Sequence, residues 1–151
     1  MNLLVDAHRL DGYLLAIAEL KGDGTHFSCV YLGEVAPVDA GPALCIVFKL
    51  GSDGLRLQPA QPMERSGFPA SLEHWILNRV RPMSTADESA LDRRLVDGLH
   101  AELVDIFGKT PQWLEVAHLP PHPHVHLGAF WNFYVFGVDG GSCAIHCAWD
   151  D

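Results

Sequence analysis

The chain has 151 residues, of which 48% are hydrophobic and 19% are charged, and this composition excludes a disordered or low-complexity protein. Its length fits one compact domain spanning residues 1–151. Nineteen acidic residues against ten basic ones give a formal net charge of −9, which disfavours direct binding to nucleic acid or to an anionic membrane surface.

The N-terminal residues show no secretion signal. The segment from Met1 to Asp6 has no basic region before its apolar run, and no apolar stretch in the chain reaches the length of a membrane span. Four cysteines without a signal are typical of a reducing compartment, so we expect a cytoplasmic protein in which Cys29 and Cys45 are buried as small apolar residues.

The N-terminal part of the chain predicts four strands arranged as two hairpins. Apolar runs at residues 13–20 and 26–35 flank one glycine-rich loop, and runs at residues 43–50 and 55–59 flank a second. Asp11-Gly12 favours a break before the first run. The alternative, a helix over this region, fits the spacing of the apolar residues Leu3, Ala7, Leu10, Leu14 and Ile17.

Two helices are predicted in the middle of the chain. The first is short, ends at Arg81-Pro82, and is marked by the apolar residues Leu72, Trp75, Ile76 and Val80. The second begins with a capping box formed by Thr85 and Glu88 and ends at Gly108. Its apolar stripe consists of Leu91, Leu95, Leu99, Leu103 and Ile106.

A last pair of strands is predicted at residues 124–137 and 142–149, around an Asp139-Gly140 turn. Strands followed by two helices and then by strands indicate an α+β fold. The simplest arrangement is an antiparallel sheet of about six strands with both helices packed on one face.

Five aromatic residues fall within the segment 130–136, and strand alternation makes both faces of this segment apolar. One face can be covered by the helices, whereas the other needs a further layer, a second copy of the chain or a partner protein. A homodimeric accessory protein, in which this strand meets its twin, is therefore one functional alternative.

A second alternative is a zinc-binding protein or metalloenzyme built on the C-terminal part of the chain. His122, His124 and His126 alternate, so a strand would place their imidazoles on one face, and Cys143 and Cys147 follow on the next strand. Pro121 and Pro123 favour a loop for the first two histidines, and the cysteine spacing fits a zinc finger only loosely. The simpler interpretation is a histidine-rich loop beside small core cysteines.

The chain contains none of the common nucleophile, phosphate-loop or metallopeptidase motifs, so we assign no catalytic residues and no cofactor. A small acidic α+β chain of this kind is similar in profile to bacterial immunity proteins, which neutralise a cognate toxin by covering its active site. The similarity lies in composition and layout. It implies a noncatalytic protein that attracts a basic toxin over long range and holds it with a few anchors. The candidate anchors and steering charges are Trp113, Trp131, Trp149, Asp87, Asp97, Asp105, Asp150 and Asp151.

Overall fold

The computed structural model describes residues 2–22, 24–51, 54–61, 67–77, 90–109, 111–118, 130–138 and 140–150. In chain order, its elements are α1 (Leu3–Lys21), β1 (Thr25–Gly33), the short 3-10 helix η1 (Pro37–Asp39), α2 (Gly41–Phe48), β2 (Arg56–Pro59), α3 (Ala70–Ile76), α4 (Ala90–Phe107), β3 (Trp113–His118), β4 (Phe130–Val138) and β5 (Gly141–Trp149). Within this described part, none of the helices combines the length and apolar composition that crossing a membrane requires.

The strands form one five-stranded sheet in the order β1-β5-β4-β3-β2, and every neighbouring pair is antiparallel. The predicted α+β class and antiparallel sheet are therefore confirmed. The numbers differ, because the described residues form five strands and four α-helices instead of about six strands and two helices. Strands β1 and β2 lie at the two edges of the sheet, and β4 and β5 lie inside it.

The first predicted hairpin is wrong, because residues 13–20 belong to the helix α1 and only the second run forms a strand, β1. The Asn2 side chain caps α1 by accepting hydrogen bonds from the N–H groups of Leu4 and Val5. Asp11-Gly12 does not break the helix, since a row of buried residues on both sides of it packs against the sheet: Ala7, Leu10, Leu14, Ile17 and Ala18. Tertiary packing outweighs the local turn signal here.

The second predicted hairpin is also wrong, because most of residues 43–50 form the helix α2. Pro42 in the first turn suits a helix start, and Lys49, with φ of 56°, ends the helix in the left-handed conformation. Of the two strands predicted for that hairpin, only β2 (Arg56–Pro59) forms. It pairs with β3, a strand that the sequence did not predict.

The later elements agree with the prediction. Helices α3 and α4 lie where two helices were expected, and β4 and β5 form the predicted C-terminal hairpin. The buried stripe of α4 consists of Val96, Leu99, Leu103 and Ile106, whereas Leu91, at the first turn, is exposed. The predicted capping box of Thr85 and Glu88 lies outside the described residues.

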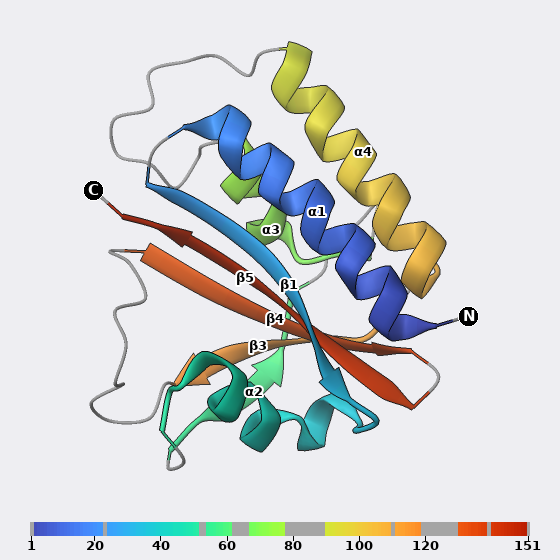
Figure 1. Ribbon diagram of the computed structural model, residues 1–151, viewed down its shortest axis with the longest axis vertical. Helices are drawn as coiled ribbons and strands as arrows, with labels where there is room; N and C mark the ends of the chain where they lie inside the picture. The colour runs from blue at the N-terminus through green and yellow to red at the C-terminus, as the bar shows by residue number, and fades with distance from the viewer. Residues whose placement is uncertain are drawn as a thin grey trace.

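Helices cover both faces of the sheet. Helices α1, α3 and α4 lie on one face of the sheet (Figure 1). Their apolar side chains share one core with Phe27, Tyr134 and Ile145. The short helix α2 lies on the opposite face (Figure 1), and its side chains share a second core with Phe133 and Val135. Strand β4, which carries the five aromatic residues, is thus apolar on both faces, and α2 supplies a second layer over part of it.

Candidate functional site

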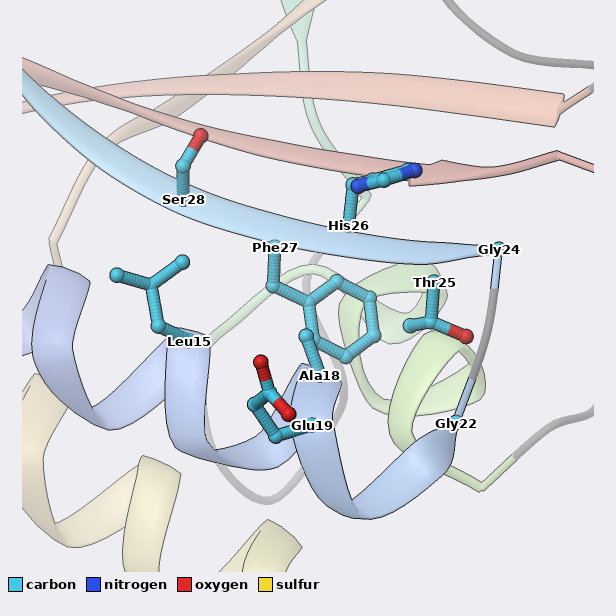
Figure 2. A pocket seen from close by; sticks show the side chains of 9 residues that line it. All are labelled: Leu15, Ala18, Glu19, Gly22, Gly24, Thr25, His26, Phe27 and Ser28. Carbon is cyan, nitrogen blue, oxygen red and sulfur yellow. The ribbon is translucent and has the colours of Figure 1, made fainter.

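A groove of about 410 Å³ opens between the C-terminal half of α1 and the first half of β1 (Figure 2). We call it the β1 groove, and it is lined by Leu15, Ala18, Glu19, Gly22, Gly24, Thr25, His26, Phe27 and Ser28. Successive side chains of a strand point to opposite faces, so a continuous run of lining residues from 24 to 28 indicates that the groove follows the edge of β1.

The side chains of the groove come from both faces of the strand. Figure 2 shows Phe27 pointing toward α1, where Leu15 and Ala18 lie, and Ser28 pointing to the opposite face of the sheet. Because β1 is an edge strand, the space beside it is bounded by its backbone as well as by these side chains.

Two hydrogen bonds fix which backbone groups of β1 face the groove. The backbone N–H of Asp150 donates to the carbonyl of Gly24 over 2.8 Å, so Gly24 faces β5. The backbone N–H of Cys29 donates to Asp11 Oδ1 over 2.8 Å, so Cys29 faces outward, toward α1. Because this orientation alternates along a strand, the N–H and C=O of Phe27 also face outward.

Glycines allow α1 and β1 to lie this close together. Gly22 ends α1 with φ of 95°. Gly24 has φ of 83°, and a Cβ atom there would lie 2.1 Å from the backbone oxygen of Asp150. The tight turn therefore requires glycine at position 24, and it sets the start of β1 beside the end of α1.

The β1 groove has a mixed lining, in which apolar side chains lie beside the polar side chains of Thr25, His26 and Ser28 and beside one carboxylate, Glu19. Ala18 is buried, Leu15 is 50% exposed, and the Glu19 carboxylate lies on the exposed side of α1. The neighbouring cation, Lys21, is engaged in an ion pair with Asp92 that leaves its side chain only 4% exposed. None of the described residues that line the groove is a lysine or an arginine.

The opposite face of the sheet holds a half-buried histidine, His146, across from the groove. His146 pairs with Ser28 in the β1–β5 register, stacks on Phe133 at a centroid distance of 4.3 Å, and meets the edge of Phe48 at 5.4 Å. Burial, with a smaller effect from the positive charge of His26, lowers the pKa of His146 to about 4. The imidazole is therefore neutral at pH 7 and serves as an aromatic core residue.

The predicted steering acids do not form one cluster among the described residues. Asp97 is exposed on α4, and Asp105 Oδ2 on the same helix accepts a hydrogen bond from Arg9 over 2.8 Å. Asp150 follows β5 and lies beside the turn that carries Gly24. Asp87 and Asp151 lie outside the described residues.

The three predicted tryptophan anchors occupy different environments. Trp113 is only 5% exposed and packs between Phe107 and Phe136, so most of its ring lies in the core. Trp131 is half-buried on the face covered by α2. Trp149 is half-buried at the end of β5, where it stacks on the exposed ring of Phe130 at 5.4 Å.

The candidate metal ligands are not brought together within the described residues. Cys143 and Cys147 share the face of β5 that packs against the helices, as strand alternation predicts, and both are buried. Burial raises the pKa of Cys147 well above its usual range. The described residues contain no group of three potential ligands, and His122, His124 and His126 lie outside them.

The residue that sequence reasoning missed is Asp11. It was interpreted as part of a turn, yet its side chain lies on the sheet side of α1 and binds the edge of β1. The signal was present, because a carboxylate next to Leu10 in an apolar helical stripe needs a polar partner. The identity of that partner followed only from the fold.

Comparison of the chain with protein-family models, curated proteins and solved structures found no match.

Proposed function

We propose that this protein is a noncatalytic binding protein for a basic partner protein, in the manner of an immunity protein that covers the active site of a cognate toxin. The observation that carries the proposal is the β1 groove, where apolar side chains and the Glu19 carboxylate of α1 lie beside the edge strand β1. Apolar side chains supply contact area for a partner, and the carboxylate favours a cationic one.

The charge of the chain supports the same proposal. A formal net charge of −9 attracts a basic partner over long range, and exposed acids are present on several elements, including Glu19, Glu34 and Asp97. Asp105 contributes less, because Arg9 lies against both Asp105 and Glu102. Long-range attraction of this kind raises the association rate more than it strengthens the final complex.

Apolar side chains on the outer side of α1 offer contact area beside the groove. Leu15 is 50% exposed and lines the groove, and Leu20, five residues later in α1, is 61% exposed. Exposed apolar side chains near a carboxylate are a common composition of protein interfaces. The four free, buried cysteines are compatible with a reducing compartment, and we place the protein in the cytoplasm as part of the proposal.

Co-expression tests this function. The chain is produced together with each protein encoded by a neighbouring gene, and growth and copurification are measured. We expect growth arrest by the partner alone, rescue by the chain, and a complex that survives gel filtration. Rescue without a complex, or a complex that leaves the partner fully active, would argue against inhibition by direct binding.

A further inference from the structure

The helix α2 is apolar on its outer side as well as on its buried side. All of its residues, Gly41–Phe48, have apolar side chains or none. Leu44 and Cys45 are buried in the core between α2 and the sheet, whereas Ile46 is 78% exposed and Val47 is 41% exposed. A helix that is apolar all round is normally covered on every side. The described part of the chain leaves the outer side of α2 uncovered at Ile46.

The 3-10 helix η1 extends this apolar side. Val38 in η1 is 71% exposed, and the buried residue Ala40 joins η1 to α2 with a helical backbone conformation. Val38, Pro42 and Ile46 are all exposed and follow each other at four-residue spacing, which places them on one side of this helical segment. We call the surface made of Val38, Pro42, Ile46 and Val47 the α2 patch. Exposed apolar patches mark contact sites for other molecules.

One acidic and one basic residue lie at the two ends of the α2 patch. Asp39 lies at its start, in η1, and Lys49 lies at its end, directly after α2. Both side chains are exposed. Their charges cancel, so the patch is locally neutral although the whole chain carries a formal charge of −9. A neutral apolar patch offers a basic partner little electrostatic attraction, which distinguishes it from the surface beside Glu19.

The order of these residues makes the patch complementary to itself. When two copies of α2 pack antiparallel around a twofold axis that passes beside position 44, each residue meets the one that lies equally far on the other side of that position. Pro42 of one copy then packs on Ile46 of the other, and Asp39 faces Lys49. Apolar contacts occupy the centre of this arrangement, and a pair of opposite charges lies at each end.

We propose that a second copy of this chain docks on the α2 patch and forms a twofold-symmetric dimer. This dimer differs from the one considered from the sequence, in which the aromatic segment 130–136 meets its twin, because α2 packs over part of that segment. The inference does not rest on the proposed function, since α2 and α1 lie on opposite faces of the sheet (Figure 1).

The size of the contact area limits the strength of this dimer. The α2 patch belongs to one short helical segment, and interfaces of small area form weak, transient complexes. The charge of −9 on each copy adds a long-range repulsion, which salt at about 0.15 M screens beyond about 8 Å. We therefore expect a dissociation constant on the order of 100 µM.

Sedimentation of the whole chain from about 10 µM to about 1 mM, in about 0.15 M salt, measures the dimer. The mean mass should rise toward that of two chains over this range. Ile46→Glu should weaken the dimer by at least about tenfold, because it brings two carboxylates into the apolar centre of the interface. Val5→Glu, at an exposed position of α1, changes the net charge equally and should alter the dissociation constant by less than about twofold.

Exchange of the two charges tests the antiparallel arrangement. Asp39→Lys and Lys49→Asp each place like charges opposite each other, and each should weaken the dimer by about threefold or more. Asp39→Lys also reduces the overall negative charge, so a weaker dimer in that variant reports the local contact. The double variant keeps the net charge of the chain and should recover most of the affinity. Aspartate tolerates the positive φ of position 49.

Four results would overturn the proposal. These are a chain that stays monomeric at every concentration, a dimer that Ile46→Glu leaves unchanged, a double charge variant without recovery, and a monomeric chain that loses a copurified partner on Ile46→Glu, which would identify that partner as the occupant. A dimer that forms in the absence of any basic partner supports this inference and leaves the proposed function without support, so the two proposals can fail separately.

Discussion

The Asp11 carboxylate accepts a hydrogen bond from the backbone N–H of Cys29 over 2.8 Å, which joins the middle of α1 to the middle of β1. This contact covers one of the outward-facing backbone donors of the edge strand β1. Folds protect such edges with charged side chains or by covering them with a helix. Here the helix α1 supplies the side chain that caps the edge at Cys29.

Replacing Asp11 should destabilise the chain and remove the cap from the edge of β1 at Cys29. Asp11→Ala leaves the Cys29 N–H without its acceptor, and we expect a loss of roughly 1–3 kcal/mol in the free energy of unfolding. Urea unfolding measures the loss, and sedimentation detects increased self-association. Asp97→Ala, at an exposed position of α4, is the control and should change stability by less than about 0.5 kcal/mol. Equal stability of the two variants would contradict this role of Asp11.

Two glycines inside helices should respond differently to alanine. Gly12 in α1 has open space around it, so Gly12→Ala should stabilise the chain by about 0.5–1 kcal/mol through helix propensity. A Cβ at Gly98 in α4 would lie 2.1 Å from the Tyr13 hydroxyl, which donates to the Leu95 carbonyl over 3.1 Å. Gly98→Ala should therefore be less stable than Gly12→Ala by at least about 1 kcal/mol.

Thermal unfolding of these variants in a Tyr13→Phe background provides the control. Removal of the hydroxyl should shrink the difference between the two alanine variants, because the closest contact at position 98 then disappears. If the difference in stability between the two alanine variants stays the same, the Tyr13 hydroxyl is not its cause.

His146 should make the chain less stable in acid. Its folded-state pKa of about 4 lies below the ordinary value of 6.5, so the unfolded chain binds this proton more readily. The stability that depends on the neutral imidazole is fully present above pH 6.5 and is lost as the pH falls from there toward 4, reaching roughly 2 kcal/mol at pH 5.

Urea unfolding at pH 7 and pH 5 tests this contribution. His146→Phe retains an aromatic ring against Phe133 and should remove most of that pH-dependent loss. His118→Gln changes an exposed histidine at the end of β3 and serves as the matched control. If His146→Phe keeps the full loss between the two pH values, other groups cause it.

A buried carboxylate joins α3 to α4. Glu73 is 6% exposed, and its Oε1 accepts a hydrogen bond from Arg93 over 3.0 Å. Arg93→Ala should lower the free energy of unfolding by roughly 1–3 kcal/mol, because the buried Glu73 carboxylate then loses its cationic partner. Arg94→Ala, at the next exposed position, should cost less than about 0.5 kcal/mol. Similar losses for the two arginine variants would show that the ion pair is not the cause.

The elements that were predictable from the sequence are those with several consistent signals. Helix α4 has a long apolar stripe, and the hairpin of β4 and β5 has alternating apolar runs around a turn. For α1 the helix was only the alternative interpretation, and α2 was interpreted as a strand, because short apolar runs fit either period. Strand β3 was missed because its residues, such as Glu115 and His118, give no clear alternation.

The β1 groove was not predictable, since it depends on the order of strands in the sheet. Only that order shows that β1 is an edge strand and that Leu15 and Phe27 face the same space. The sequence gives the charge and aromatic content of the chain, but it does not tell which tryptophans are covered. Trp113 illustrates this, because it lies in a core made by residues distant in the chain.

The most direct test of the account is the association rate of the chain with a partner protein that copurifies with it, measured by stopped-flow fluorescence at low and high salt. We predict a rate that falls by about tenfold or more at high salt and a complex that dissociates faster with Glu19→Lys than with Glu34→Lys. A rate independent of salt, together with equal dissociation of the two variants, would contradict binding of a basic partner at the β1 groove.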